Sequence, residues 1–295
     1  MSSKYYRAFG INIKSEIDFG ALILEIEKCE EDIKISIGQI PEKIKKDIDL
    51  GKWISVSEND IWFDIPDTAI FYISNSENII VQLYKDCEIN NVIAYILGAC
   101  MGFILYQQKK LAIHGGCVAL NNKAAIICGN TGAGKTSLIT ALRLKGKKVL
   151  SDDISVVNKE NKFLVSPGYC GQKISADVLK YFNIEENKKF KTQIENKEKY
   201  IIPIRESYEK DSISLEAIIM LEQDNIESVK VKKVLWNEKI NIILNNIYLK
   251  QWINKKQLLN LYFKTALDLA KQVPIYIVKR PNKGFTMQEQ ISVIE

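Results

Sequence analysis

Eight consecutive residues in the middle of the chain form the pattern G-x-x-x-x-G-K-[ST]. They are Gly129, Asn130, Thr131, Gly132, Ala133, Gly134, Lys135 and Thr136, and Ser137 follows them. Glycine has no Cβ, so a backbone rich in it can turn its N–H groups onto phosphate oxygens. In such loops the lysine reaches the β and γ phosphates and the threonine hydroxyl reaches Mg²⁺. The pattern therefore predicts a binding site for ATP or GTP with Mg²⁺.

Two adjacent acids, Asp152 and Asp153, follow a short apolar strand at 148–150. Beside a triphosphate, one carboxylate can hold Mg²⁺ and the other can accept a proton from an attacking hydroxyl. Side chains alternate in direction on a strand, so both acids reach one spot only where the strand breaks. A solvated turn with a helix-capping aspartate is the alternative interpretation.

His114, the single histidine of the chain, precedes Gly115 and Gly116 on the strand before the glycine-rich loop. A single histidine is often a hydrogen-bonded structural residue. Its place beside the loop strand makes it a candidate to support the site.

The elements around these residues can be predicted from hydrophobic patterning. Residues 124–128 form an apolar strand into the loop and 136–144 an amphipathic helix out of it. Residues 111–120 form a strand that a tight turn at 121–123 joins antiparallel to the first, which predicts a mixed sheet. Residues 91–106 are apolar and contain Gly98 and Gly102. They predict a buried helix under the sheet, with a membrane anchor as the alternative.

We expect the chain to divide into a β-rich region at 1–88 and a domain at 89–295 that contains the phosphate-binding loop. Strands of the first region are expected at 33–37, 53–56, 61–65 and 79–83. In the second, the catalytic core spans 110–221. A helical part at 226–295 has helices at 237–250 and 255–272 and a strand at 274–278.

Basic residues after the acid pair are candidates for phosphate or acceptor contacts. A hairpin at 154–157 and 163–165 leads through a loop to Lys173, which is either such a contact or a surface lysine. The polar stretch 183–200 is either a lid or substrate loop or a disordered segment. Lys199 lies at its far edge.

Three motifs together resemble the catalytic domain of HPr kinase/phosphorylase. They are His114-Gly115-Gly116, the loop GNTGAGKT and the segment LSDDISVV at 150–157. The chain looks more similar still to HPr-kinase-related kinases encoded with ribosomally made peptides, including lasso peptides. That similarity adds YRAFGINIKSEI at 6–17 and PGYCGQK at 167–173.

The resemblance implies an α/β fold with a mixed sheet, an HPr-kinase/PEP-carboxykinase-like core with a phosphate-binding loop. It implies Asp152 as general base, supported by His114, with Asp153 and Thr136 near Mg²⁺ and Lys135 on phosphate. Arg205, after Pro203-Ile204, resembles a basic stretch of HPr kinases and would neutralise the transferring phosphoryl group. The glycine-rich signature that follows the acids in true HPr kinase/phosphorylases is not visible, so the reverse reaction and HPr as acceptor stay open.

Composition is that of an ordinary globular protein of 295 residues with a net charge of +5. Its six cysteines show no C-x-x-C spacing and predict no disulfide framework or zinc site. The lysines are spread along the chain, which does not favour nucleic acid as a partner. The first residues lack signal-peptide features, so we expect a cytoplasmic protein. The resemblance would also fit a homo-oligomer.

These observations predict an ATP-dependent kinase that phosphorylates a Ser, or Thr, hydroxyl on a ribosomal peptide precursor or small protein. Two alternatives remain open at this stage. One is a small-molecule kinase acting on free serine or another alcohol, and the other is a nucleotide-binding regulatory protein that transfers no phosphate.

Overall fold

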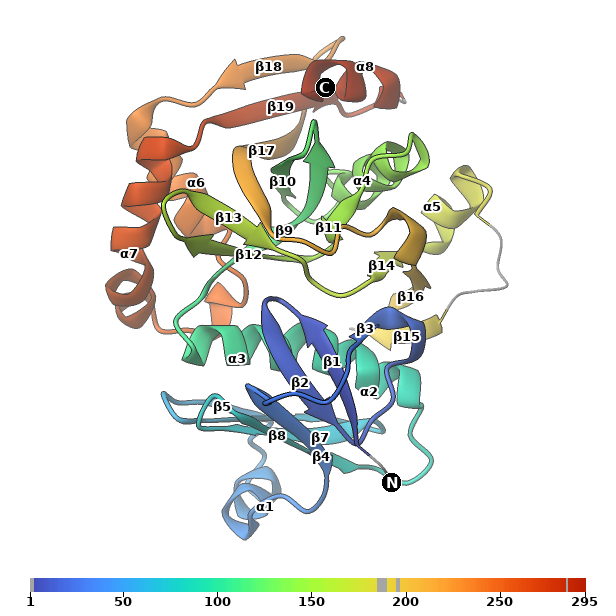
Figure 1. Cartoon of the computed structure of the whole chain (residues 1–295), viewed down its shortest axis with the longest axis vertical. Helices are drawn as coiled ribbons and strands as arrows, with labels where there is room; N and C mark the ends of the chain where they lie inside the picture. Colours follow the sequence, from blue (N-terminus) through green and yellow to red (C-terminus); the bar gives the residue numbers. More distant parts are fainter. Residues whose placement is uncertain (1–2, 185–189, 195–196, 285) are drawn as a thin grey trace.

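The computed structural model describes residues 3–184, 190–194, 197–284 and 286–295. Two mixed sheets lie on opposite sides of a long apolar helix, as Figure 1 shows. The mixed α/β class predicted from the sequence is therefore confirmed.

The N-terminal sheet is built from short strands with alternating burial. Within the described residues its order is β3-β1-β2-β4-β8-β7-β6-β5. The strands are β1 (Lys4–Ala8), β2 (Ile11–Ser15), β3 (Leu24–Glu25), β4 (Ile33–Ile37), β5 (Ile54–Val56), β6 (Asp60–Ile65), β7 (Ala69–Ser74) and β8 (Asn78–Leu83), with helix α1 (Glu42–Asp49) on the outside. The four predicted strands correspond to β4, β5, β6 and β8, while β1, β2, β3 and β7 were not predicted.

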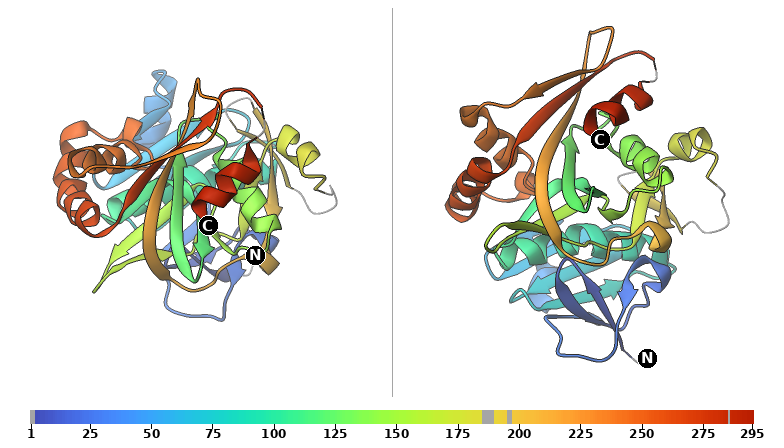
Figure 2. Two further views of the ribbon diagram at one scale, coloured as in Figure 1. Left: turned by 90° about the horizontal axis from the view of Figure 1, so that it is seen from above. Right: turned by 45° about the horizontal axis from the view of Figure 1, so that its top comes forward.

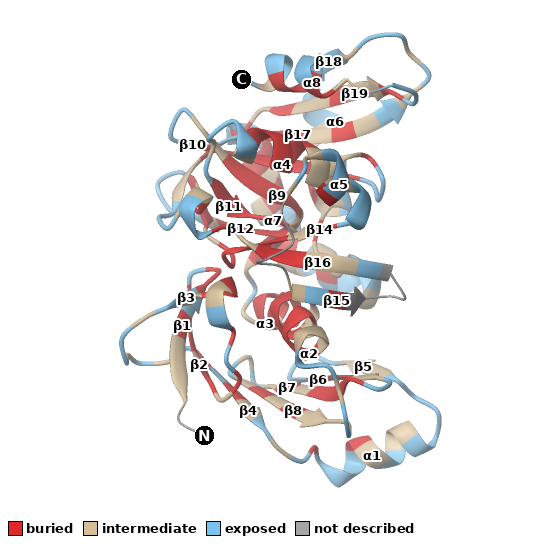
Figure 3. Cartoon of the chain, turned by 90° about the vertical axis from the view of Figure 1, so that its right-hand side faces the viewer, coloured by how far each residue is buried: buried red, intermediate tan, exposed pale blue. Residues whose placement is uncertain are grey.

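The apolar segment at 91–106 is a helix, as predicted. It runs as α2 (Ile89–Tyr95), the π-helical turn η2 (Ile96–Cys100) and α3 (Met101–Gln107). Its length and composition would suffice to cross a membrane, but 72% of its most apolar 18-residue window is buried inside the protein. Figure 3 shows it as buried along most of its length between the two sheets, which is how a core helix packs.

Gly102 lets this helix approach the C-terminal half of the chain. A Cβ at Gly102 would lie 2.5 Å from Cε1 of Tyr248 and 2.8 Å from Cδ1 of Leu249. Alanine normally stabilises a helix relative to glycine, but here the methyl group overpacks the contact. We expect Gly102→Ala to lower the free energy of unfolding by about 1–3 kcal/mol in urea denaturation. Gly38→Ala is the control, since its Cβ would meet only Ile80 at 3.6 Å. Equal or greater stability of Gly102→Ala would contradict this packing.

The second sheet carries the glycine-rich loop. Its order is β10-β9-β12-β13-β17-β19-β18, with β11 on β9 and an additional parallel pairing of β10 with β17. The strands are β9 (Leu111–Leu120), β10 (Lys123–Gly129), β11 (Val149–Ser151), β12 (Ile154–Lys159), β13 (Phe163–Ser166), β17 (Ile213–Asp224), β18 (Lys230–Lys233) and β19 (Ile275–Pro281). The predicted β9–β10 hairpin is confirmed, and Asn121 and Asn122 both have the left-handed φ angles that its turn needs.

Helices cover the two faces of this sheet differently. Figure 2 shows α4 (Lys135–Leu144) and α8 (Met287–Ile294) together on one side, with α6 (Trp236–Asn245) and α7 (Lys255–Gln272) apart from them. Helices α6 and α7 begin within one residue of the predicted positions, and α6 ends earlier than expected.

The polar stretch at 183–200 is more regular than predicted. Its described part forms β15 (Phe190–Ile194) and the beginning of β16 (Lys197–Pro203). Strand β16 pairs with β15 on one side and with β14 (Gly171–Ile174) on the other in a small sheet next to α5 (Ala176–Tyr181). Residues 185–189 and 195–196 lie outside the described residues. The expectation of a disordered excursion is therefore wrong for residues 190–194.

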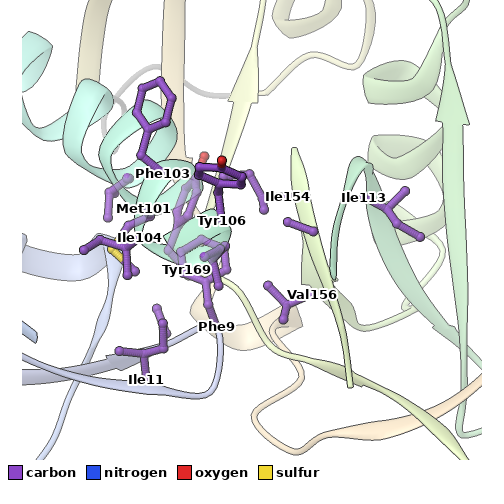
Figure 4. Packing of buried hydrophobic residues seen from close by; sticks show 14 of the residues in the cluster. Phe9, Ile11, Met101, Phe103, Ile104, Tyr106, Ile113, Ile154, Val156 and Tyr169 are labelled. Atoms are coloured by element: carbon purple, nitrogen blue, oxygen red, sulfur yellow. The ribbon is translucent and has the colours of Figure 1, made fainter. Parts of the chain in front are cut away.

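One hydrophobic core joins the two halves of the chain. Figure 4 shows Phe9 and Ile11 from the N-terminal sheet, Ile104 from α3, and Ile154 and Val156 from β12 in the same cluster. The backbone also connects the halves, since Phe9 N donates to Pro167 O at 2.7 Å. The segment that leads to Lys173 thus rests directly on the N-terminal region.

Candidate active site

The glycine-rich loop connects β10 to α4 in the predicted order of strand, loop and helix. Gly129 has φ +151°, and a Cβ there would lie 2.5 Å from Leu221 O on the neighbouring strand. Gly134, directly before the helix, has φ +103°. Both conformations favour glycine, which explains two of the fixed positions of the motif. The loop places the N-terminal end of α4, where N–H groups lack partners within the helix, at the carboxyl end of β10.

The Lys135 side chain folds back along this loop. Its ammonium donates to the carbonyl oxygen of Gly129 and, at 3.3 Å, to that of Asn130. Partial burial is the main cause of a lowered Lys135 pKa, and the charges of Asp153 and Asp152 counteract it. The ammonium therefore lies where the loop begins, within electrostatic range of both acids.

The acid pair lies in the break between β11, which ends at Ser151, and β12, which begins at Ile154. This is the arrangement that allows both carboxylates to serve one site. Gly116 is needed for it, since a Cβ there would lie 2.5 Å from Asp152 O. Gly115 N donates to Asp153 O at 3.1 Å. The two glycines after His114 thus hold the backbone of the acid pair against β9.

Asp152 is the buried member of the pair, with 8% of its surface exposed. Its Oδ2 accepts a hydrogen bond from Lys173 N at 2.8 Å, and Oδ1 has no partner among the described residues. Burial, followed by the charge of Asp153, raises the pKa of Asp152 to about 7. A carboxylate with this pKa exchanges its proton near neutral pH, which suits a general base.

Asp153 is the more exposed acid, at 28% of its side chain. Its Oδ1 lies 3.5 Å from His114 Nδ1 and its Oδ2 lies 3.6 Å from Lys173 Nζ. Burial alone would raise its pKa, but the charges of Lys173 and other neighbouring cations lower it below the ordinary value. Asp153 is therefore ionised at neutral pH and can reach a metal ion directly.

His114 contacts the second acid and not the first, which corrects its predicted support of Asp152. Its ring stacks on Tyr248 at 5.7 Å between centroids. Desolvation lowers the pKa of His114, so the imidazole is neutral at pH 7. A 3.5 Å contact with a neutral ring holds Asp153 in place only weakly.

Most of the candidates from the sequence converge on this site. Lys173 contacts both acids, through its backbone N–H and its ammonium. Lys199, on β16, is close enough for its charge to lower the pKa of both Asp152 and Asp153. Thr136 and Ser137 begin α4 and are half-buried beside the loop.

Arg205 is elsewhere, which corrects its predicted contact with phosphate. Its guanidinium donates to the carbonyl oxygens of Gly20, Ala21 and Ile23, each at 3.1 Å. Its charge is therefore used to hold the N-terminal region. The local resemblance around Pro203 carried no information on this distant contact.

Arg280, at the end of β19, was not predicted. Its Nε donates to Ala133 O at 2.8 Å and its Nη2 donates to Gly132 O at 3.3 Å. The guanidinium thus braces the outer part of the glycine-rich loop from a strand far along the chain. In the sequence, the only indication of this contact with the loop was an arginine at the end of an apolar strand.

We expect Arg280→Ala to weaken ATP binding by roughly tenfold or more, because two hydrogen bonds from a charged donor are lost. The loop would be less ordered before the nucleotide arrives, so the effect should fall on Kd more than on kcat. Lys279→Ala is a matched control, since that lysine pairs with Asp224 and not with the loop. Calorimetric titration with ATP compares the two, and wild-type affinity in Arg280→Ala would refute the brace.

Comparison with known proteins gives a distant likeness. No protein-family model matches the chain, and no curated protein matches its sequence. Among solved structures the chain is similar to the HPr(Ser) kinase/phosphatase from Coxiella burnetii. The sequence identity is 10%, the match covers 58% of this chain and 85% of that chain, and the TM-score is 0.29. At this TM-score the likeness decides nothing about function, which has to be inferred from the side chains of the site.

Proposed function

We propose that the protein is a kinase that transfers the γ-phosphoryl group of ATP or GTP to a Ser, or Thr, hydroxyl of a peptide or small protein. The support comes from one observation. A loop with the geometry and lysine of a phosphate-binding loop meets two carboxylates, of which one is ionised and the other titrates near pH 7. Phosphoryl transfer to an alcohol needs these groups in one place.

The residues present fit a nucleotide with Mg²⁺. Loop amides from Thr131 to Thr136 and the Lys135 ammonium would bind the phosphates. Mg²⁺ usually takes one or two protein ligands besides phosphate and water, and Thr136 and Asp153 can supply them. When bound, the ion offsets negative charge on the β and γ phosphates.

Asp152 would accept the proton of the attacking hydroxyl. A bond forms between the acceptor oxygen and the γ-phosphorus, the bond from that phosphorus to the bridging oxygen breaks, and the nucleoside diphosphate leaves. The hydroxyl proton goes to the Asp152 carboxylate. Lys135, Lys173 and Lys199 would offset the negative charge around the transferred group.

Access to Asp152 requires a change in its side chain, because Oδ1 is buried and Oδ2 already accepts the Lys173 N–H in the described structure. Hydrogen bonds at active sites often form only when the substrate is bound.

The roles of the two acids can be separated by metal dependence. Raised Mg²⁺ should partly restore Asp153→Asn, which has lost a ligand, but not Asp152→Asn, which has lost a base.

The test of the function is transfer of label from γ-³²P-ATP. The expected result is labelled phosphoserine or phosphothreonine in serine-containing peptides or small proteins. Label in free L-serine alone would indicate a small-molecule kinase instead. Hydrolysis without any labelled acceptor would indicate a nucleotide-dependent regulatory protein.

A further inference from the structure

A pocket of about 480 Å³ opens beside the first residue after Gly129, on the side of α6. Its lining combines apolar side chains, Met220, Ile242 and Ile277, with polar ones. The polar part comes from Asn130 of the loop, from Glu222 on β17 and from residues of α6 and the segment after it. Glu238, Asn241 and Asn245 are spaced at i, i+3 and i+7 on α6, so they share one face of the helix.

The pocket lies beside the part of the loop at which a terminal phosphate is expected. Asn130 is the loop residue that lines it, and the Lys135 ammonium donates to the carbonyl oxygens of Gly129 and Asn130. This lysine is the one that reaches the β and γ phosphates in phosphate-binding loops. The α-phosphate and the nucleoside would therefore extend away from Asn130, and an acceptor would approach from the pocket.

The pocket is also connected to the acid pair. Asn246 O accepts the His114 backbone N–H at 2.6 Å, and His114 Nδ1 lies 3.5 Å from Asp153 Oδ1. One lining residue, Asn246, is thus linked to Asp153 through a single residue, His114. A molecule in the pocket would have one end beside Asn130 of the loop, with His114 between the pocket and Asp153.

The size of the pocket and the residues that line it indicate what kind of acceptor it could bind. A pocket of this size is within the range of roughly 300–1,000 Å³ that holds drug-sized ligands, and a single free amino acid would fill only part of it. Asparagine amides both donate and accept hydrogen bonds, as a peptide backbone does. The charged residues of the lining are Glu222, Glu238 and Lys250. Glu238 is already paired with Lys232 at 3.3 Å, so one carboxylate and one lysine remain.

We propose that this pocket binds the polypeptide segment adjacent to the phosphorylated residue. The inference rests on the proposed kinase function. Asn241 and Asn245 would hydrogen-bond the main chain of the acceptor, and an apolar side chain would lie on Met220 and Ile277.

The experiment uses the full chain and a library of capped decapeptides, each with one central serine and the flanking positions varied. The variant is Asn241→Leu/Asn245→Leu, two exposed positions where substitution costs little stability. We expect KM for the best peptide to rise roughly ten- to a hundredfold, as two lost hydrogen bonds predict. ATP affinity should be unchanged. Asn237→Leu, exposed on the same helix but outside the pocket, is the control and should match wild type.

Three results would overturn the inference, and they differ in what they say of the kinase. An unchanged KM for peptide in the double variant would rule out the pocket as a peptide-binding site and would leave the kinase proposal intact. Weakened ATP binding with unchanged peptide KM would assign the pocket to the nucleoside. Failure of the wild type to label any peptide or small protein would overturn both proposals.

Discussion

Asp152→Asn is expected to reduce phosphoryl transfer by roughly 10² to 10⁴ while ATP affinity stays near that of wild type, because the change removes a base and leaves the loop intact. The amide keeps the shape of the carboxylate and can still accept the 2.8 Å hydrogen bond from Lys173 N. Single-turnover transfer to a labelled peptide measures the chemical step, and calorimetry measures ATP binding. Wild-type turnover in Asp152→Asn would disprove the role of this residue.

The pH dependence gives a second test of the same carboxylate. The base must be deprotonated, so wild-type kcat/KM should rise with pH to about 7 and then level off. Stability has the opposite slope. The folded protein keeps a proton on Asp152 between the ordinary pKa of 3.8 and about 7, where the unfolded chain has lost it, so the free energy of unfolding falls as pH rises through this window. Asp152→Asn should remove that part of the fall, which denaturation at pH 5 and pH 8 can measure.

Lys135→Ala is expected to damage both binding and catalysis. The ammonium would contact the terminal phosphates in the ground state and would offset the charge of the transferring group. We expect kcat to fall by roughly 10² to 10³, as for the loss of one electrostatic donor, together with weaker ATP binding. Steady-state kinetics and ATP titration separate the two effects.

Lys145→Ala is the matched control for that variant. Lys145 follows the last residue of α4, is exposed, and donates to Gln288 on α8. It removes the same charge from the other end of the helix, so near-wild-type activity is expected. A kcat for Lys135→Ala within a factor of a few of Lys145→Ala would show that the loop lysine does not act on the reacting phosphate.

Features set by nearby residues could be predicted from the sequence. The strand, loop and helix around Gly129 follow from glycines whose φ angles other residues rarely adopt. The β9–β10 hairpin follows from Asn121 and Asn122, which tolerate left-handed conformations. The bend at the acid pair was likewise recognisable where an apolar strand met two charges.

Features that depend on residues far apart in the sequence could not be predicted from it. Arg280 reaches the loop because β19 pairs with β17 and β17 pairs with β10, and neither parallel pairing has a local signature. Arg205 looked suitable for phosphate but bonds to carbonyl oxygens near residue 20. The β1–β2 turn was missed because Phe9 has φ +59°, an uncommon conformation for a bulky side chain.

The shared core has a consequence for any attempt to shorten the chain. Residues 1–88 supply one wall around the α2–α3 helix, and Arg205 and Pro167 bind backbone groups of that wall. A fragment that begins at residue 89 would expose a broad apolar surface to water. It would also lose the N-terminal residues on which the segment leading to Lys173 rests. Truncation should therefore yield precipitate rather than a shorter folded protein, even though the motifs of the candidate active site all lie beyond the cut.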